Sequence, residues 1–136
     1  MVYSVASLST VAECDSVTAL VEKVKADLIY KQGLIQHKQA GFAVSSVSIN
    51  AELSGVNVQL TAFEGMVPNL PAGPLTDDNN SKIEGLNHRK FLLLKKQKES
   101  GSVALLESEM EFGLNEKQVA ELHVILAAIA ARKAAL

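Results

Sequence analysis

The chain has 136 residues, of which 48% are hydrophobic and 21% are charged, and its formal net charge is -2 at pH 7. The length suits a single domain, the composition excludes an intrinsically disordered protein, and the charge excludes a general basic field for nucleic acid. A single cysteine excludes an intrachain disulfide. The first residues do not show the basic segment followed by an apolar segment that is typical of a signal peptide. No run of apolar residues approaches the roughly 20 needed to span a membrane. We therefore expect a cytoplasmic protein without a transmembrane segment.

The first predicted helix begins at Thr10-Val11-Ala12-Glu13, where Thr10 and Glu13 have the three-residue spacing of a capping box. An apolar stripe at steps of three and four then predicts a helix that ends near Gly41, a residue suited to a C-terminal cap. The stripe consists of Cys14, Val17, Val21, Val24, Leu28 and Ile35, with Lys31 interrupting one turn.

Residues 47–63 fit two structures. Ile49, Leu53 and Val56 begin a series at alternating steps of four and three that continues through Leu60, Phe63 and Val67, which predicts a helix. The same segment also alternates apolar and polar residues around Ser54-Gly55, which fits a β-hairpin. We favour the helix and keep the hairpin, with an α+β fold, as the alternative.

All three prolines, Pro68, Pro71 and Pro74, fall within residues 65–80. Because proline breaks a helix interior, this stretch predicts a connector between a first arm, 10–67, and a second arm, 81–136. Asp77, Asn79 and their neighbours offer N-caps beyond the prolines, and Ser81-Lys82-Ile83-Glu84 fits a second capping box.

The second arm shows two interruptions. The apolar pattern that starts with Ile83 and Leu86 stops at Lys95 and resumes at Val103, so we expect the chain to turn at Gly101. A pause near Gly113 precedes Asn115 and Gln118, which fit a third capping box ahead of a last helix. The pattern as a whole predicts one all-α domain, 1–136, of two antiparallel helical hairpins, arranged as a four-helix up-and-down bundle or as an extended coiled-coil-like structure.

The candidates for chemistry are few. Glu84 and His88 would share one helix face, but two ligands make a poor metal site, so we expect no metal and no cofactor. We expect His123 to border an apolar stripe and Cys14 to be a small buried hydrophobic residue rather than a reactive thiol. No combination of residue types in the sequence predicts a catalytic site, and we expect a protein that is not an enzyme.

One stretch, residues 88–98, carries five basic residues and no acidic residue: Arg89, Lys90, Lys95, Lys96 and Lys98. These residues form a possible anion-binding site for a polyanion or an acidic membrane surface. Their positions spread around a helix, however, so we do not favour nucleic acid as a partner. The leading hypothesis is a structural or protein-protein interaction module that forms homo-oligomers through apolar helix seams and has a further, unidentified protein partner. Polyanion or membrane-surface binding is the alternative.

Overall fold

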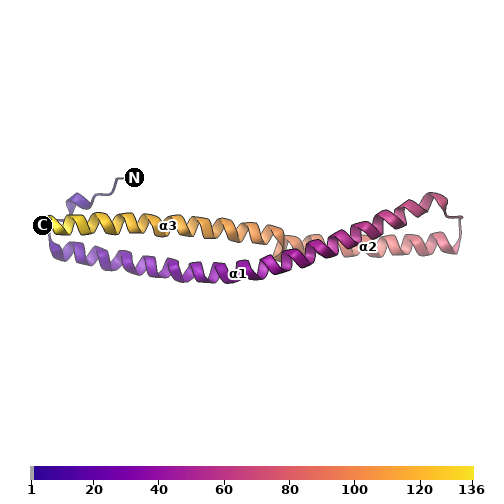
Figure 1. Ribbon diagram of the computed structural model, residues 1–136, viewed down its shortest axis with the longest axis horizontal. Coiled ribbons are helices and arrows are strands. Elements are labelled where there is room, and N and C mark those ends of the chain that lie inside the picture. The colour runs from indigo at the N-terminus through magenta and orange to yellow at the C-terminus, as the bar shows by residue number, and fades with distance from the viewer. Residues whose placement is uncertain (1) are drawn as a thin grey trace. The chain divides into compact units, whose positions relative to one another are not determined.

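The computed structural model describes residues 2–136 and is built from helices (Figure 1). Two short 3-10 turns, Val5–Ser7 and Val67–Asn69, accompany three long helices, α1 (Val11–Met66), α2 (Pro74–Ser100) and α3 (Ser102–Ala134). No strand occurs among the described residues, so the alternative β-hairpin at 47–63 is wrong. The predicted all-α class with antiparallel helix packing is confirmed.

The chain divides into two compact units, and α1 contributes to both. The first unit combines the chain up to Lys38 with Ser108–Leu136, so that the first half of α1 pairs with α3. The second unit, Gln39–Glu107, pairs the second half of α1 with α2 and with the beginning of α3. In each unit the partner segment runs antiparallel to α1.

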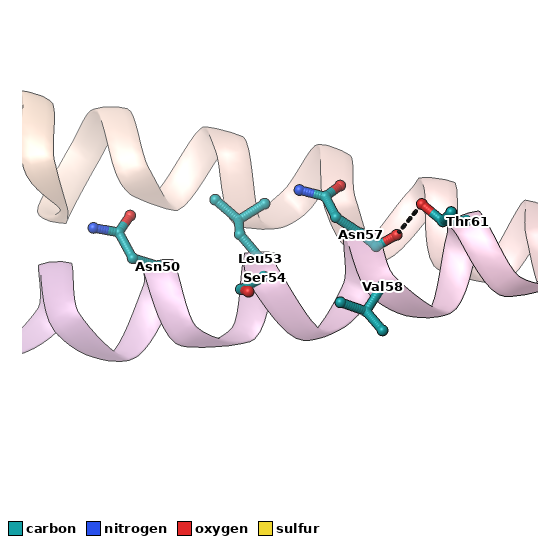
Figure 2. A pocket seen from close by; sticks show the side chains of 6 residues that line it. All are labelled: Asn50, Leu53, Ser54, Asn57, Val58 and Thr61. Atoms are coloured by element: carbon teal, nitrogen blue, oxygen red, sulfur yellow. Dashed lines mark hydrogen bonds between the residues drawn. The ribbon is translucent and has the colours of Figure 1, made fainter.

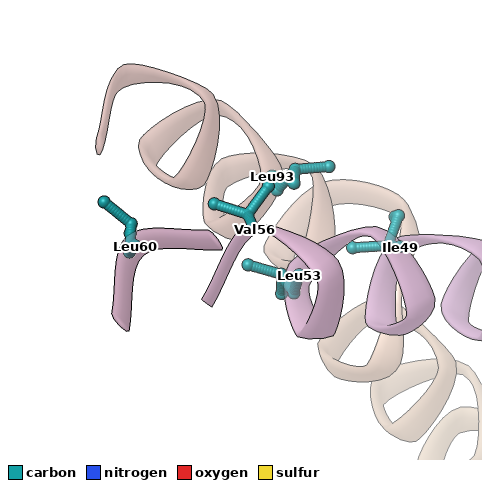
Figure 3. Close-up of a cluster of buried hydrophobic side chains, with 5 residues drawn as sticks. All are labelled: Ile49, Leu53, Val56, Leu60 and Leu93. Atoms are coloured by element: carbon teal, nitrogen blue, oxygen red, sulfur yellow. The ribbon is translucent and has the colours of Figure 1, made fainter. Parts of the chain in front are cut away.

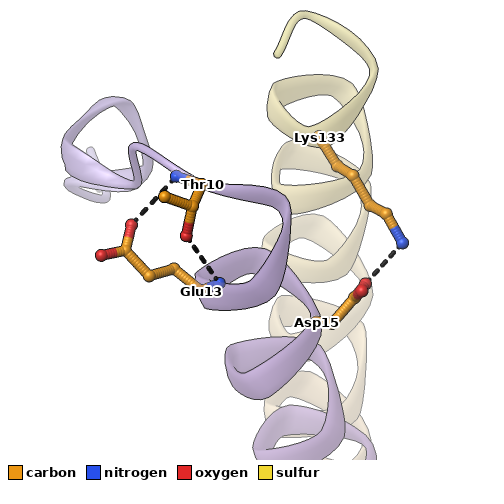
Figure 4. Close-up of polar contacts among 4 residues, drawn as sticks. All are labelled: Thr10, Glu13, Asp15 and Lys133. Atoms are coloured by element: carbon orange, nitrogen blue, oxygen red, sulfur yellow. Dashed lines mark hydrogen bonds and ion pairs between the residues drawn. The ribbon is translucent and has the colours of Figure 1, made fainter.

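The predicted capping box at the start of α1 is confirmed (Figure 4). The Glu13 N–H donates to Thr10 Oγ1 at 3.1 Å, and Glu13 Oε2 accepts from the Thr10 N–H at 3.1 Å. The same carboxylate oxygen accepts from the Ser9 N–H at 2.7 Å and from Ser9 Oγ at 3.0 Å. These bonds occupy backbone donors that have no partner within the helix.

Two heptad series on α1 face the partner helices without interruption. The first series is apolar throughout and contains Cys14, Val21, Leu28, Ile35, Phe42, Ile49, Val56 and Phe63. The second contains Thr18, Lys25, Gln32, Gln39, Ser46, Leu53 and Leu60, and all members of both series are buried or half-buried. We call the line of contact between these two series and the partner helices the seam. The predicted stripe was partly wrong, because Val24 is 42% exposed and Lys25 lies in the seam in its place. Alternating steps of three and four over this length are typical of a left-handed coiled coil.

The predicted helix end at Gly41 is wrong, because α1 continues to Met66. The seam explains the continuation, since Phe42 follows Gln39 by three residues and Ser46 follows Phe42 by four. A glycine in a helix interior costs about 1 kcal/mol relative to alanine. Burial of a single large apolar side chain contributes about 1.5–3 kcal/mol, so packing outweighs the local signal.

The chain reverses at the prolines, over fewer residues than predicted. Pro68 lies in the 3-10 turn, and Pro74 is the first residue of α2, a position where its missing N–H is no loss. Gly73, the N-cap, has φ 137, which a residue with a Cβ rarely adopts. Asn79, predicted as an N-cap, lies inside α2 and donates from Nδ2 to the Phe63 carbonyl at 3.2 Å. It therefore occupies a backbone acceptor in the last turn of α1, where carbonyls lack helical partners.

The core of the second unit is a single cluster of Ile49, Leu53, Val56 and Leu60 from α1 with Leu93 from α2 (Figure 3). Ile83 and Leu86 pack against this cluster. The series that starts at Ile49 was predicted as helical, and it is buried or half-buried as far as Phe63. Its last predicted member, Val67, is instead 42% exposed and lies in the 3-10 turn after α1.

A helix break at Gly101 was predicted and is present, but the chain does not reverse there. Gln97 Nε2 donates to Asn50 Oδ1 at 2.9 Å, and Asn50 Nδ2 donates to Ser102 Oγ at 3.3 Å. Ser102 also exchanges a 2.9 Å hydrogen bond with Ser46. Residues on both sides of the break thus contact neighbouring turns of α1.

The break shifts the seam by one residue. Along α2 the half-buried and buried positions include Leu93 and Gln97, a phase that would next place Glu107 and Leu114 in the seam. On α3 the buried residues Ser108, Asn115 and Ile129 instead follow a heptad series one residue later, and Ala104 is also buried. One extra residue in a continuous helix would rotate the following side chains by about 100°. The interruption at Gly101 absorbs that residue and keeps α3 facing α1.

The first unit has its own cluster, in which Cys14 and Val21 of α1 meet Ile129 of α3. Val5 and Leu8, which precede α1, pack against it, and Arg132 Nε donates to the Leu8 carbonyl at 2.9 Å. Lys133 of α3 is paired with Asp15 of α1, with Nζ 2.5 Å from Oδ1. Figure 4 shows the pair.

The predicted capping boxes at Ser81 and Asn115 are wrong, because both residues lie inside continuous helices. Asn115 is 2% exposed, and neither polar atom of its side chain has a hydrogen-bond partner among the described residues. It occupies the same heptad series as the apolar Leu122 and Ile129. Continuing the helix through Asn115 keeps these two side chains in the seam.

Candidate interaction surface

The residues considered for chemistry are dispersed. Cys14 is 0% exposed within an apolar cluster, as predicted for a structural cysteine. His88 and Glu84 are exposed on α2, and His123 is exposed on α3. Within residues 2–136, no group of three or more metal-ligating side chains is gathered in one place.

The five basic residues of 88–98 lie on α2 and do not form one surface. Arg89 is paired with Glu52 of α1, and Lys90 is half-buried. The other three are exposed: Lys95, Lys96 and Lys98. Anion binding by these residues stays a prediction, and the pairing of Arg89 leaves four cations without a common face.

The outward face of α1 in the second unit is uncharged. Between Lys38 and Glu64 the only charged residue is Glu52, and its carboxylate is paired with Arg89. The outward positions are all exposed and are occupied by small or β-branched residues: Ala40, Gly41, Val44, Val47, Ser48, Ala51, Ser54, Gly55, Val58, Thr61 and Ala62. We call this set the neutral face.

Three valines make the neutral face apolar as well as uncharged. Val44 is 74% exposed, Val47 is 72% exposed and Val58 is 68% exposed. Around them, alanine, glycine and serine side chains are too small to hold a second helix away from the backbone of α1. A solvent-exposed helix face usually carries polar and charged residues, so this composition is typical of a surface that contacts another protein segment.

A shallow groove of about 570 Å³ runs along the edge of this face. Figure 2 shows the side chains of Asn50, Leu53 and Asn57 on the side of α1 toward the neighbouring helix, and Val58 directed away from it. Ser54 and Thr61 complete the lining. The Thr61 hydroxyl donates from Oγ1 to the Asn57 carbonyl at 2.9 Å, so this polar group of the groove is already bonded within α1.

Exposed apolar pairs also occur on the other helices. Large side chains three or four residues apart share a helix face, and such pairs are exposed on all three helices. They are Leu20 with Val24 and Tyr30 with Leu34 on α1, Phe91 with Leu94 on α2, and Met110 with Leu114 on α3. Twenty-two large hydrophobic residues are exposed among the described residues, whereas ten hydrophobic residues are buried. Pairing two helices buries one stripe of each, which leaves this apolar surface uncovered.

The neutral face was not predicted, although its signal is present in the sequence. Apolar periodicity identifies the face of a helix that is buried, and residues 40–62 contain one clear apolar stripe. The signal for the neutral face is the absence of charged residues on the opposite side of the same helix. That absence indicates a surface only if residues 40–62 form one helix.

No protein-family model, curated protein or solved structure matches this chain. None of the helices within residues 2–136 is both long enough and apolar enough to cross a membrane.

Proposed function

We propose that this protein is a non-enzymatic structural or interaction module of the cytoplasm that self-associates through apolar helix surfaces. The observation that carries the proposal is the excess of exposed over buried large apolar side chains, arranged in pairs on helix faces. Removing apolar surface from water contributes about 25 cal/mol per Å². Helices of another chain that cover these exposed side chains would therefore stabilise an assembly. A second copy of the same chain can provide such helices.

Sedimentation velocity between about 10 and 300 μM tests self-association directly. We expect the weight-average sedimentation coefficient to rise with concentration and to fall again on dilution. A strictly monomeric species over the whole range would contradict the proposal. A repeat at lower salt concentration is the control. An apolar association depends less on ionic strength than a charged one, so the sedimentation coefficients should change little.

A further protein partner would use the surfaces that self-association leaves open. Affinity capture from the native cell, performed in parallel with the chain carrying Leu114→Lys, separates partners of the exposed α3 pair from background. We expect Leu114→Lys to reduce capture of such a partner and to leave the melting temperature nearly unchanged, because Leu114 is exposed.

A further inference from the structure

We propose that residues 3–8 form a strap that covers the apolar end of the first unit and opens while α1 and α3 stay paired. The strap precedes α1 and contains the 3-10 turn Val5–Ser7. Its contacts lie within the first unit of one copy, so the proposal does not depend on self-association. Opening exposes an apolar surface, with the Cys14 thiol in it, that the closed form hides.

The depth of burial at this end indicates a third segment beside the two helices. Cys14 is 0% exposed and Ile129 is 1% exposed, the lowest values among the described hydrophobic residues of the first unit. Both nevertheless lie near helix ends, because α1 begins at Val11 and α3 ends at Ala134. Leu28, farther along the same heptad series of α1, is only half-buried although it lies well inside the helix pair. Two paired helices therefore do not account for complete burial at the end of the pair.

The strap provides this third segment. Val5 and Leu8 are half-buried and pack against the cluster that holds these two residues. Two hydrogen bonds join the strap to α3: Arg132 Nε donates to the Leu8 carbonyl at 2.9 Å, and the Tyr3 hydroxyl donates to the Glu121 carboxylate. The attachment thus consists of two apolar side chains and one polar contact near each end of the strap.

The strap is separate from the backbone structure of the helices. In the part of the chain that the structure describes, its backbone-to-backbone hydrogen bonds are internal to its turn, and none joins it to α1 or α3. The cap of α1 is also independent, because Glu13 accepts hydrogen bonds from Ser9 and Thr10, which follow the strap. Opening therefore breaks no backbone bond between segments and leaves the first turn of α1 capped.

The small contact area sets the expected population of the open form. Local opening costs less free energy than global unfolding when it exposes less buried surface. The strap contributes two half-buried apolar side chains, whereas α1 and α3 share a seam that runs through the whole first unit. We therefore expect the open form to be more populated than the unfolded form.

The Cys14 thiol provides the readout, because it is the single cysteine of the chain and is fully buried under the closed strap. Wild type is labelled at low micromolar concentration with an aromatic disulfide reagent in increasing urea, and global unfolding is measured in parallel by circular dichroism. We expect labelling at least about tenfold faster than global unfolding allows, with a weaker urea dependence, because opening exposes less surface. Labelling with the rate and urea dependence of global unfolding would overturn the proposal.

Two alanine variants separate opening of the strap from weakening of the seam. Leu8→Ala removes a strap contact and should speed Cys14 labelling about tenfold. Ile35→Ala is the matched control, because Ile35 is 3% exposed, lies about 30 Å along α1 from Cys14 and stabilises the open and closed forms alike. It should lower the melting temperature and leave Cys14 labelling unchanged.

Each remaining outcome contradicts the proposal. An unchanged rate in Leu8→Ala would show that the strap does not protect the thiol. Acceleration in Ile35→Ala that matches the gain in unfolding would show that the thiol is reached by unfolding and not by opening. Arg132→Met, which removes the donor to the Leu8 carbonyl and keeps an unbranched side chain, repeats the test if Leu8→Ala does not fold. These results are independent of the oligomeric state, which sedimentation measures.

Discussion

Glu13 holds the first turn of α1 by accepting hydrogen bonds from Ser9 and Thr10. The bond from the Ser9 N–H is the main cause that lowers the pKa of Glu13 below its ordinary value of 4.5, and the Ser9 hydroxyl and the Thr10 N–H add to it. Hydrogen bonds to a carboxylate favour its charged form. The cap is therefore strongest when Glu13 is ionised.

The lowered pKa gives the stability a defined pH dependence. Because the folded pKa lies below the unfolded one, the contribution of Glu13 is complete above about pH 4.5 and is lost as the pH falls through the lowered value. Glu13→Gln keeps an acceptor but removes the charge. We expect this variant to melt at a lower temperature than wild type at pH 7, and the difference to shrink below pH 4. Glu99→Gln, an exposed position outside the cap, controls for the loss of one negative charge; a pH-independent difference for Glu13→Gln would contradict the prediction.

Three capping boxes fit the sequence, the one at Asn115 best, and only the one at Thr10 caps a helix. A cap contributes about 1 kcal/mol. At Ser81 and Asn115, ending a helix to gain a cap would remove later apolar side chains from contact with α1, and the helices continue instead. Leu122 and Ile129 follow Asn115 at heptad spacing, and burying both is worth more than one cap. Local patterns predicted the residues that can cap, but the choice among them depends on packing between segments far apart in the sequence.

At the scale of the helix, Gly101 is the one position where the backbone requires glycine because of a close approach. A Cβ added there would lie 2.7 Å from the Gln97 Cα, a distance that side-chain movement cannot relieve. The break also corrects the phase of the seam, so a helix that continued through it would turn α3 away from α1. The sequence predicted the position of this break, but its role as a phase shift follows only from the burial on both sides.

We expect Gly101→Ala to lower the free energy of unfolding by about 1–3 kcal/mol, the range for strained backbone positions. Gly85→Ala is the matched control, since a Cβ there meets no atom within 4 Å and the residue lies inside α2. That variant should be more stable than wild type by up to about 1 kcal/mol. Urea unfolding of the pair measures both changes, and a stabilised Gly101→Ala protein would refute the proposed constraint.

At the scale of the whole molecule, the fold class was predictable and the pairing of the helices was not. The amphipathic stripes identify which face of each helix is buried, but a stripe of Leu, Val and Ile accepts many partners. The apolar series at Ile49 and the last helix after Asn115 were both predicted, yet their partners lie across the proline turn rather than within their own arms. The neutral face was missed for a related reason, because Gly41 was taken as a helix end and residues 40–62 were not compared as one continuous helix.

The two clusters predict two separately supported regions. Leu93 and Ile129 are each 1% exposed and belong to different clusters. We expect Leu93→Ala to speed amide hydrogen exchange mainly in residues 39–107, and Ile129→Ala to do so mainly in 11–38 and 108–134. Each truncation should cost about 2–5 kcal/mol in its own region. Uniform acceleration along the chain in both variants would show a single cooperative unit instead.

The position of the chain reversal also sets the order in which contacts become available during synthesis. Asn79 reaches a carbonyl 16 residues earlier, Gln97 reaches a side chain 47 residues earlier, and Arg132 reaches a carbonyl 124 residues earlier. Closing a longer loop costs more entropy, so the helices should join first near the prolines and close toward the chain ends. The first half of α1 is made early but meets its partner only when residues 108–136 have been made. Until then the apolar stripe of this half has no intramolecular partner, so its burial depends on the part of the chain that is made last among the residues described.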